Sequence, residues 1–419
     1  MAPRPVGRER AALVGLSAAA SRRLEAEASL EELAGLADAA GALVVARVLQ
    51  ERSAPDPATY VGQGKAAMLG ATCEELDVDL VICDAELTPG QLRHLEAAAG
   101  RRVVDRTQLI LDIFARRART REGKLQVELA QLQYLLPRLA NSGTTLSRLG
   151  GGIGTRGPGE TKLESDRRRI RSRIHVLKAA IDQVRQRRAQ MRGRRKKAAT
   201  PVVALVGYTN AGKTTLFNRL TDARAHTSDA LFVTLDPLVR HVTIADQRGL
   251  LLSDTVGFVD RLPHALVAAF RATLEEVSEA DLLLHVVDAA APDMVRRVGA
   301  VRRVLDEVGA SDVPTLDVYN KCDAVEPDGL RRLHDREPAG VCLSARTGAG
   351  VGELVDVVAA RLALDAVRVT LSFDALEGER ISRLYCIGRV LSHEVHDGRV
   401  AIVAELPRRL VSQFAADAR

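Results

Sequence analysis

The sequence contains few cysteines and no long hydrophobic run. Its cysteines stand singly, without a CxxC pair, so neither a disulfide framework nor a zinc site is predicted. We interpret all five as small buried residues, namely Cys73, Cys83, Cys322, Cys342 and Cys386. No apolar stretch approaches the roughly 20 residues that span a bilayer, and the opening MAPRPVGRER has no apolar signal core. We therefore expect a cytoplasmic protein without membrane insertion.

Positive charge is concentrated in one segment of the chain. The 419 residues together carry a net charge of +6 at pH 7. Between Arg167 and Lys197, fourteen lysines and arginines stand against a single acid, Asp182. A charged helix face is often simply solvated, but charge of one sign repels itself, so this segment favours a polyanionic partner such as RNA.

Apolar runs divide the chain into four predicted domains of an α/β protein. Short strands alternate with helical patterns in residues 1–115 and again in 200–365, as expected for parallel sheets covered by helices. We predict a small N-terminal α/β domain in the first region and a doubly wound domain in the second. Long helical periodicity occupies 116–199, and the runs VRVTLSF, RLYCIGRVL and VAIVAEL predict a small β-rich domain in 366–419.

The region 116–199 has the apolar spacing of two packed helices. The apolar residues recur at intervals of three and four: Leu125, Leu129, Leu132 and Leu136, and then Ile170, Ile174, Leu177, Ile181 and Val184. These are a and d positions of heptads, which pack two helices along a narrow seam. We predict an antiparallel helical hairpin that forms an arm, with residues 141–164 as its loop.

The loop of this hairpin is rich in glycine. The stretch LGGGIGTRGPGETKLE contains G-x-G-x-x-G at Gly152, Gly154 and Gly157. That pattern holds a dinucleotide only where a strand leads into it, because the phosphate must meet a helix N-terminus in a βαβ unit. A helical pattern precedes these glycines instead. We interpret the loop as the tip of a cationic arm, where glycines let backbone N–H groups approach phosphates and bases closely.

The motif GYTNAGKT lies between the apolar run VVALV and the helical run TLFNRL. It fits the G-x-x-x-x-G-K-[ST] phosphate loop (P-loop) in its required strand, loop and helix context. Backbone N–H groups would surround the phosphates, Lys213 would neutralise the β- and γ-phosphates, and the Thr214 hydroxyl would ligate Mg²⁺. The predicted nucleotide contacts here are Gly207, Tyr208, Thr209, Asn210, Ala211, Gly212, Lys213, Thr214 and Thr215.

Three further motifs follow other predicted strands. DTVG can hold Mg²⁺ through water and offer a glycine N–H to the γ-phosphate. NKCD indicates guanine, because the Asp323 carboxylate can accept from the ring imino and exocyclic amino groups while Asn320 reads the opposite edge. SAR supplies a backbone N–H for the guanine carbonyl. The predicted ligands are therefore GTP and GDP, and the predicted contacts are Asp254, Thr255, Val256, Gly257, Asn320, Lys321, Asp323, Ser344, Ala345 and Arg346.

A switch hydroxyl that senses the γ-phosphate through Mg²⁺ is expected between the P-loop and DTVG. The candidates are Thr221, Thr227 and Thr234. We choose Thr234 because it lies in FVTLDP, just before a strand-like run; Phe232 and Val233 are then also nucleotide contacts. The predicted metal ligands are Thr214 and Thr234, and the predicted catalytic residues are Lys213, Thr234 and Gly257.

Phe258 follows DTVG, at the position where many GTPases have a glutamine that orients the attacking water. A phenylalanine side chain cannot hydrogen-bond to water. Hydrolysis must therefore use another group, a cation or a partner's assistance, and we predict slow intrinsic turnover that the partner stimulates. Asn210 in the P-loop is a candidate for holding a monovalent cation beside the phosphates.

The combined motifs resemble the HflX family of ribosome-associated GTPases. The resemblance covers residues 10–365 and is carried by RTQLILDIFARRARTREGKLQVELAQLQYLLPRL, GGIGTRGPGETKLESDRRRIRSRI, GYTNAGKTTLFNRLT, FVTLDP and LLLSDTVGFVDRLPHALVAAFRATLEE. It implies an N-terminal HflX domain, a helical arm, a GTPase domain and a variable C-terminal domain. It also implies binding to the large ribosomal subunit, with the arm's tip towards the peptidyl-transferase region, and GTP-dependent dissociation of stalled ribosomes.

Two classes of function stay open from the sequence. The first is a GTPase that binds the large ribosomal subunit through rRNA, acts as a monomer, and dissociates or rescues stalled ribosomes. The alternative is a GTP-dependent signalling switch that binds a protein effector, with the basic arm on an acidic partner. The arm's tip has no cluster of Trp, Phe or Leu to insert in lipid, which weighs against a membrane surface.

Overall fold

The computed structural model describes most of the chain in two compact units. The described residues are 8–140, 158–197, 200–221, 231–260 apart from 233, 236–237 and 245–247, 276–363, 366–407 apart from 397, and 411 and 414. One unit takes in the described parts of Met1–Val184, Thr227–Asp236 and Val259–Ala272; the other takes in those of Arg185–His226, Pro237–Phe258 and Thr273–Arg419. Residues 141–157, most of the predicted arm tip, lie outside the described residues. The residue boundaries of the four predicted domains stay a prediction.

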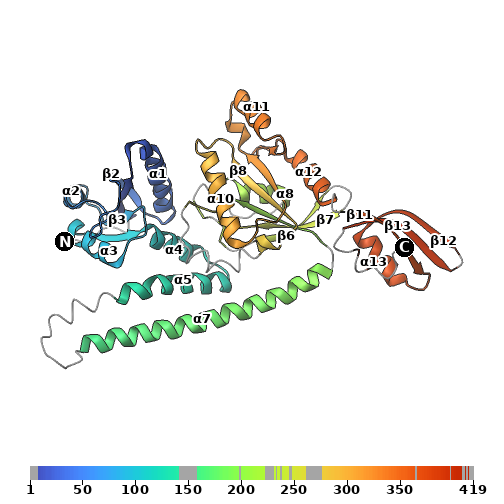
Figure 1. Cartoon of the computed structure of the whole chain (residues 1–419), viewed down its shortest axis with the longest axis horizontal. Helices are drawn as coiled ribbons and strands as arrows, with labels where there is room; N and C mark the ends of the chain where they lie inside the picture. The colour runs from blue at the N-terminus through green and yellow to red at the C-terminus, as the bar shows by residue number, and fades with distance from the viewer. Residues whose placement is uncertain are drawn as a thin grey trace. The chain divides into compact units, whose positions relative to one another are not determined.

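The N-terminal domain has a parallel sheet of four strands in the order β2-β1-β3-β4 (Figure 1). The strands are β1 (Arg10–Ser17), β2 (Leu43–Glu51), β3 (Leu80–Cys83) and β4 (Arg102–Asp105). The helices between and after them are η1 (Ala20–Arg22), α1 (Arg23–Ala39), α2 (Gln63–Glu75), α3 (Pro89–Ala99) and α4 (Arg106–Arg117). The predicted alternation of strands and helices is confirmed.

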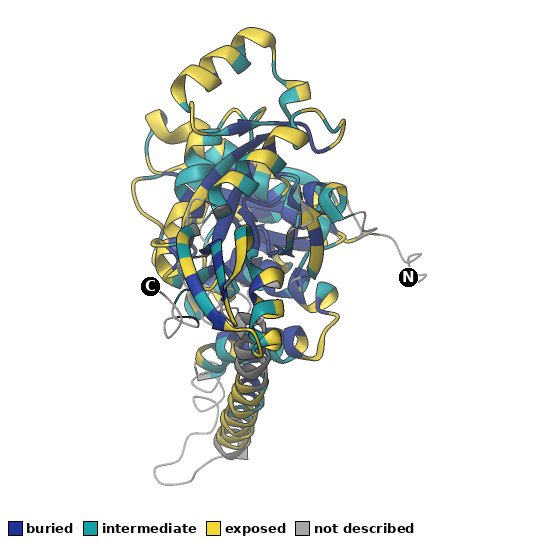
Figure 2. Cartoon of the chain, turned by 90° about the vertical axis from the view of Figure 1, so that its right-hand side faces the viewer, coloured by how far each residue is buried: buried dark blue, intermediate teal, exposed yellow. Residues whose placement is uncertain are grey.

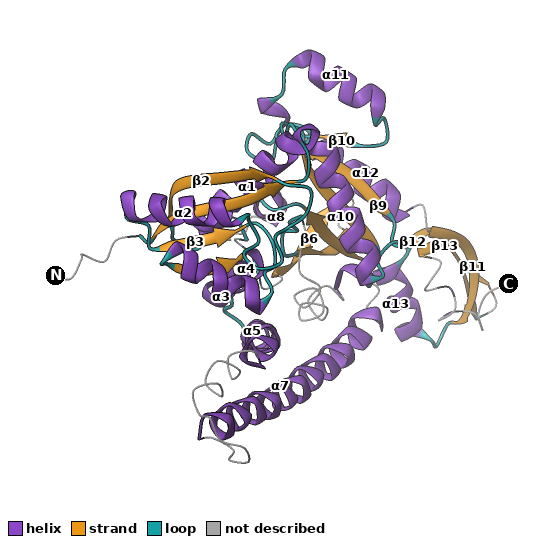
Figure 3. Cartoon of the chain, turned by 60° about the vertical axis from the view of Figure 1, so that its left-hand side comes forward, coloured by secondary structure: helices purple, strands orange, loops and turns teal. Residues whose placement is uncertain are grey.

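Alternate residues of the N-terminal strands pack on opposite faces of the sheet. Ala12 and Val14 of β1 belong to the core beneath α2 and α3. On the other face Gly15 lies against Leu30 of α1, and α1 packs beside α4. Figure 3 shows helices on both faces, which is the arrangement that fully buried parallel strands require.

Two long helices form the predicted arm. Helix α5 (Arg121–Ala140) packs beside α7 (Pro158–Lys197) through a seam in which Leu129, Leu177 and Ile181 are buried (Figure 1). The seam is the predicted heptad stripe. Residues 158–164, which the prediction placed in the loop, belong to α7, because this helix begins at Pro158. Proline is well tolerated in the first turn of a helix, where its missing N–H costs nothing.

The second α/β domain has a six-stranded sheet in the order β10-β9-β8-β5-β7-β6. Its strands are β5 (Val202–Gly207), β6 (Leu238–Ile244), β7 (Arg248–Asp254), β8 (Leu282–Asp288), β9 (Thr315–Asn320) and β10 (Val341–Cys342). Five strands are parallel, and the edge strand β6 runs antiparallel to β7. The doubly wound prediction is confirmed, with this one antiparallel edge added.

Helices cover both faces of the second sheet. They are α8 (Lys213–Thr221), α10 (Met294–Val308), η3 (Cys322–Ala324), α11 (Pro327–Arg336) and α12 (Val351–Ala363). Leu216 and Phe217 of α8 and Leu354 of α12 share one core with the sheet, whereas Met294 of α10 and Leu333 of α11 pack on the other side. The buried strands between them appear dark blue in Figure 2.

The C-terminal domain is an antiparallel sheet with one helix. Strands β11 (Ala366–Asp374), β12 (Arg389–His396) and β13 (Arg399–Pro407) pair in the order β11-β13-β12. The β-rich class is confirmed, but the prediction of a strand through RLYCIGRVL is wrong in its first half, because α13 (Gly378–Ile387) occupies it. Ile381, Leu384 and Ile387 recur every three residues and pack on the sheet, so the helical period prevails.

Among the described residues, no helix is long and apolar enough to cross a membrane. Four of the five cysteines are described, and all four are free thiols: Cys73 and Cys83 are buried, and Cys322 and Cys342 are partly buried. Their interpretation as small packing residues therefore holds for Cys73 and Cys83 and only in part for the other two. Cys386 lies outside the side chains that the structure describes.

Leu177→Ala should loosen the arm. Leu177 is 1% exposed in the seam, so its truncation should cost about 2–5 kcal/mol, whereas Val176→Ala, at a neighbouring position that is 53% exposed, should cost less than about 0.5 kcal/mol. Hydrogen exchange of the α5 and α7 amides measures the difference. Equal exchange in the two variants would show that the seam does not hold the hairpin together.

Candidate functional site

The predicted motifs lie at the carboxyl ends of parallel strands. The P-loop follows β5, DTVG follows β7, NKCD follows β9 and SAR follows β10. Open α/β sheets bind ligands at this edge, because loops and helix N-termini converge there. The four motifs belong to one compact unit, so the fold brings the P-loop, Asp254, Asn320 and the SAR segment together.

The ammonium of Lys213 is buried inside the P-loop. Its Nζ donates to the carbonyl of Gly207 at 3.0 Å and to that of Tyr208 at 2.9 Å. Burial lowers the pKa of Lys213 to about 8, against the opposing effect of the nearby Asp254 carboxylate. A lysine held in this way is poised beside the backbone N–H groups of the loop, where it can neutralise a phosphate.

Thr214 and Asp254 place a hydroxyl and a carboxylate side by side. The Thr214 hydroxyl donates to Asp254 Oδ2 at 2.9 Å, and Asp254 is fully buried at the end of β7. Oxygen donors of this kind are the ligands that Mg²⁺ prefers, and a buried carboxylate favours a cation beside it. The pair therefore fits a magnesium ion. Thr255 turns inward, and its hydroxyl donates to the carbonyl of Leu205 at 2.6 Å.

The residue after DTVG is tied to the P-loop by its backbone. The N–H of Phe258 donates to the carbonyl of Gly207 at 3.1 Å, and the carbonyl of Phe258 accepts from the N–H of Thr209 at 2.7 Å. The ring of Phe258 is 1% exposed, among the largest fully buried side chains. The sequence identified Phe258 as unable to orient water, but it carried no signal for this backbone pairing.

The Asn320 side chain hydrogen-bonds to both the P-loop and the SAR loop. Its Nδ2 donates to the carbonyl of Ala211 at 2.8 Å, and its Oδ1 accepts from the N–H of Ala345 at 2.9 Å. Gly212, with φ +91, leaves no room for a Cβ beside this amide. Asn320 therefore fixes the distance between the P-loop and the SAR loop, in addition to any contact with a base.

Asp323 faces the SAR loop. It pairs with the guanidinium of Arg346, and the Ser344 hydroxyl together with Arg346 holds the pKa of its carboxyl below the usual value. Lys321 sits at φ +64 and donates to Asp288 Oδ2 at 2.8 Å. Sequence reasoning missed Arg219 of α8, which donates to the carbonyls of Ala345 and Arg346 and holds the loop in place.

The predicted switch residues belong to the other compact unit, with the N-terminal domain. Phe232, at φ +57, is 2% exposed, and its ring meets Phe114 of α4 edge-on at 4.7 Å between centroids. Thr234 is partly buried, and Val233 lies outside the described residues. Arg106, also on α4, donates to the backbone carbonyl of Asp260 at 3.2 Å. Segments on either side of DTVG are thus held by one helix.

Arg106 is a buried cation paired with a buried acid, Asp84, and a partly buried acid, Glu32. It is 3% exposed and pairs with Glu32, while its Nη1 donates to Asp84 Oδ1 at 2.8 Å. Asp84 also accepts from the Ser29 hydroxyl at 2.5 Å. A buried guanidinium is tolerated only with such partners, so these residues fix the start of α4 against α1 and β3.

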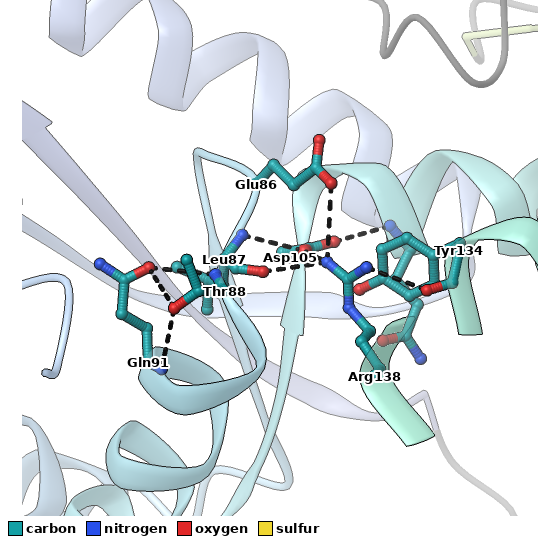
Figure 4. Close-up of polar contacts among 8 residues, drawn as sticks. Glu86, Leu87, Thr88, Gln91, Asp105, Tyr134 and Arg138 are labelled. Carbon is teal, nitrogen blue, oxygen red and sulfur yellow. Dashed lines mark hydrogen bonds and ion pairs between the residues drawn. The ribbon is translucent and has the colours of Figure 1, made fainter. Parts of the chain in front are cut away.

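A second buried network joins the arm to the N-terminal domain (Figure 4). Asp105, fully buried at the end of β4, accepts from the N–H of Leu87 at 3.0 Å and from Arg138 Nη2 at 3.0 Å. Arg138, near the end of α5, also donates to the carbonyl of Leu87 at 2.9 Å and lies 3.4 Å above the ring of Tyr134. No motif marked these residues, because their partners lie far apart in the sequence.

Three known families match successive parts of the chain. The family described as GTP-binding GTPase N-terminal matches residues 27–115, GTP-binding GTPase Middle Region matches 117–195, and 50S ribosome-binding GTPase matches 202–321. The matches follow the order of the N-terminal domain, the arm and the P-loop domain.

Similar proteins extend over nearly the whole chain. GTPase HflX of Caldanaerobacter subterraneus subsp. tengcongensis is 45% identical over 401 residues, which is 95% of this chain and 91% of that protein. GTPase HflX of Escherichia coli K12 is 46% identical over 394 residues, 92% of each chain. Among solved structures, a GTP-binding protein from Sulfolobus solfataricus in complex with GDP is 24% identical, covers 84% of this chain and 98% of that chain, and has a TM-score of 0.43.

Lys213 should make nucleotide binding depend on pH. A bound polyphosphate stabilises the protonated ammonium, whose pKa of about 8 means that it is charged below this pH and increasingly neutral above it. Binding above pH 8 must therefore take up a proton, and GDP affinity should fall there by about tenfold for each pH unit. Calorimetry in buffers of different ionisation enthalpy should show little proton uptake at pH 7 and clear uptake at pH 8.5.

The matched variant for this titration is Lys213→Arg. A guanidinium stays charged throughout the range, so the variant should lose the pH dependence even if its affinity is lower. The same pH dependence in both proteins would assign the titration to another group.

Proposed function

The chain belongs to the HflX family of GTPases, and on that premise we propose that it binds the large ribosomal subunit and uses its GTP state to dissociate or rescue stalled ribosomes. As a member of this family it hydrolyses GTP. The description of the family matched by residues 202–321, a 50S ribosome-binding GTPase, supports the large subunit as partner. The observation that carries the proposal in this structure is the arm, a pair of packed helices with exposed cations on α7.

Each motif has a proposed role towards the nucleotide. Lys213 neutralises the β- and γ-phosphates, and the Gly257 N–H meets the γ-phosphate. Asp323 accepts from the guanine imino and amino groups. Asn320 holds the SAR loop in place, because its Oδ1 accepts from the Ala345 N–H. Support comes from the burial of Lys213 among P-loop carbonyls and from the bridge that Asn320 makes between two loops.

We assign the magnesium site to Thr214 and Thr234, with Asp254 acting through water. The metal would neutralise charge on the β- and γ-phosphates. The adjacent Thr214 hydroxyl and Asp254 carboxylate support the first half of this site. Thr234 follows Phe232 by two residues, and Phe232 is packed on α4, so the position of Thr234 is coupled to that of the N-terminal domain.

The arm presents positive charge to solvent. On α7, Arg168, Arg169, Arg171 and Lys178 are exposed, whereas Arg173 pairs with Glu128 of α5 at 2.7 and 2.9 Å. Arg173 therefore bridges the two helices of the arm, and its cationic neighbours on α7 remain available to a polyanion. An array of exposed arginines on a stiff helix suits phosphates of folded RNA better than one acidic protein loop.

A chain of contacts links the predicted switch segment at Phe232, and the segment after DTVG at Asp260, to the arm. Phe232 and Asp260 contact α4 through Phe114 and Arg106. Asp105, the N-cap of α4, accepts from Arg138, which stands three residues before the tip segment. We propose that this path couples the GTP state to the position of the arm on the ribosome.

Asp323→Asn should shift base preference from guanine to xanthine nucleotides. An asparagine can donate to the xanthine carbonyl but cannot accept from both guanine donors, so GTP affinity should fall by about tenfold to a hundredfold. Competition titrations of GTP against XTP measure the change. Asp328→Asn, at an exposed position on α11, is the control and should keep guanine preference. Unchanged selectivity in Asp323→Asn would refute the base assignment.

The protein loaded with a non-hydrolysable GTP analogue should sediment with 50S subunits in a sucrose gradient. If about six arm cations meet phosphates, the log of affinity should fall with the log of salt concentration at a slope near −4 to −5, at about −0.7 to −0.9 for each phosphate. Protein that stays at the top of the gradient at low salt would overturn the ribosomal proposal and favour a protein effector.

Two charge-removing variants distinguish ribosome binding through the arm from binding through the net charge of the protein. The triple variant R168A/R169A/R171A removes three exposed cations from α7, and R331A/R332A/R336A removes three from α11. Only the first should weaken sedimentation and flatten the salt slope by roughly 2 to 3. Equal effects would show that net charge, rather than the arm, determines binding.

A further inference from the structure

Thr209 in the P-loop carries a buried hydroxyl for which the proposed nucleotide contacts give no role. The residue is 3% exposed, and its Oγ1 is buried without a hydrogen-bond partner among the residues that the structure describes. Native proteins seldom leave a buried hydroxyl unpaired, because the lost hydration is costly. A group that binds in the P-loop is the natural source of the missing partner.

The Thr209 side chain lies beside the point where the γ-phosphate of GTP is proposed to sit. A Cβ built on Gly257 would lie 2.8 Å from Thr209 Cγ2 and 3.2 Å from Lys213 Nζ. Thr209, Gly257 and the Lys213 ammonium therefore surround one point. The N–H of Thr209 donates to the Phe258 carbonyl at 2.7 Å, which fixes the residue in this position.

GTP hydrolysis here needs a group that orients water. The Phe258 ring is buried in the core, and both of its backbone polar groups are engaged by the P-loop. The glutamine found at that position in other GTPases orients the attacking water, and its amide has both an acceptor and a donor. A threonine hydroxyl also has both, since its oxygen accepts while its O–H donates.

We propose that the Thr209 hydroxyl positions the attacking water during GTP hydrolysis, accepting a hydrogen bond from the water and donating one to a γ-phosphate oxygen. The water oxygen forms a bond to the γ-phosphorus while the bond to the β–γ bridging oxygen breaks. GDP leaves with that electron pair, and the protons of the water pass to the released phosphate and to solvent. The hydroxyl itself neither gains nor loses a proton. The inference rests on the proposed seat of the γ-phosphate at Lys213 and is independent of the ribosome.

Thr209→Val and Thr209→Ser separate the hydroxyl from the rest of the side chain. Valine keeps the branched shape and the methyl contact with Gly257, and serine keeps only the hydroxyl. Single-turnover hydrolysis of GTP by the purified full-length protein should be about tenfold to a hundredfold slower in Thr209→Val and close to wild type in Thr209→Ser. Thr315→Val, which removes an exposed hydroxyl at the start of β9, is the matched control and should hydrolyse normally.

Binding measurements decide how the hydroxyl acts. Thr209→Val should bind GDP as tightly as wild type and lose affinity, in parallel with rate, for GDP with aluminium fluoride, which mimics the transferring phosphoryl group. Retained GDP binding also shows that the variant is folded. Wild-type hydrolysis in Thr209→Val, or a loss of GDP affinity as large as the loss of rate, would overturn the proposal. Failure of the wild-type protein to bind GDP would instead overturn the proposed nucleotide site.

Discussion

The backbone pairing between Phe258 and the P-loop is the constraint on which the arrangement of the site depends. Its two hydrogen bonds join the end of β7 to the end of β5 and hold Gly257 against Thr209 and Lys213. The same pairing places the Phe258 ring in the core. A glutamine at this position would have its amide buried there, away from phosphate. The backbone pairing and the packing of the Phe258 ring are therefore linked in this chain, and the group that orients water must come from elsewhere, which is the role that we propose for Thr209.

Two consecutive residues, Asp105 and Arg106, serve different partners at the start of α4. Asp105 accepts from Arg138 of the arm, and Arg106 donates to the backbone of Asp260 beyond DTVG. Both side chains are buried and have several partners, so neither can move without breaking a compensated polar network. The start of α4 is thus a rigid point of the N-terminal domain that contacts both the arm and the segment after DTVG.

Sequence patterns predicted the local parts of this molecule well. The P-loop, the strands that lead into each motif, and the heptad seam at Leu129, Leu177 and Ile181 depend on short spacings that a single stretch of chain contains. The run RLYCIGRVL misled because its apolar residues fit a strand as readily as a helix of period near three. The beginning of α7 at Pro158 was hidden by neighbouring glycines, which are typical of loops.

The parts that could not be predicted depend on pairs of residues distant in sequence. Asp105 and Arg138 belong to no motif. Arg219 lies in an ordinary helix, and the SAR loop to which it donates is more than a hundred residues further along the chain. The identity of Phe258 was visible, but its pairing with Gly207 needs the alignment of two strand ends. An orphaned hydroxyl such as that of Thr209 is visible only once its surroundings are known.

Helix α7 is continuous for 40 residues, beginning in one compact unit and ending in the other. At 1.5 Å per residue it is about 60 Å long. A rotation of about 5° at the end that joins the P-loop domain would sweep the opposite end through about 5 Å, comparable to one helical turn. A long continuous helix thus has the leverage to turn a small rotation at one end into a displacement of about one helical turn at the other.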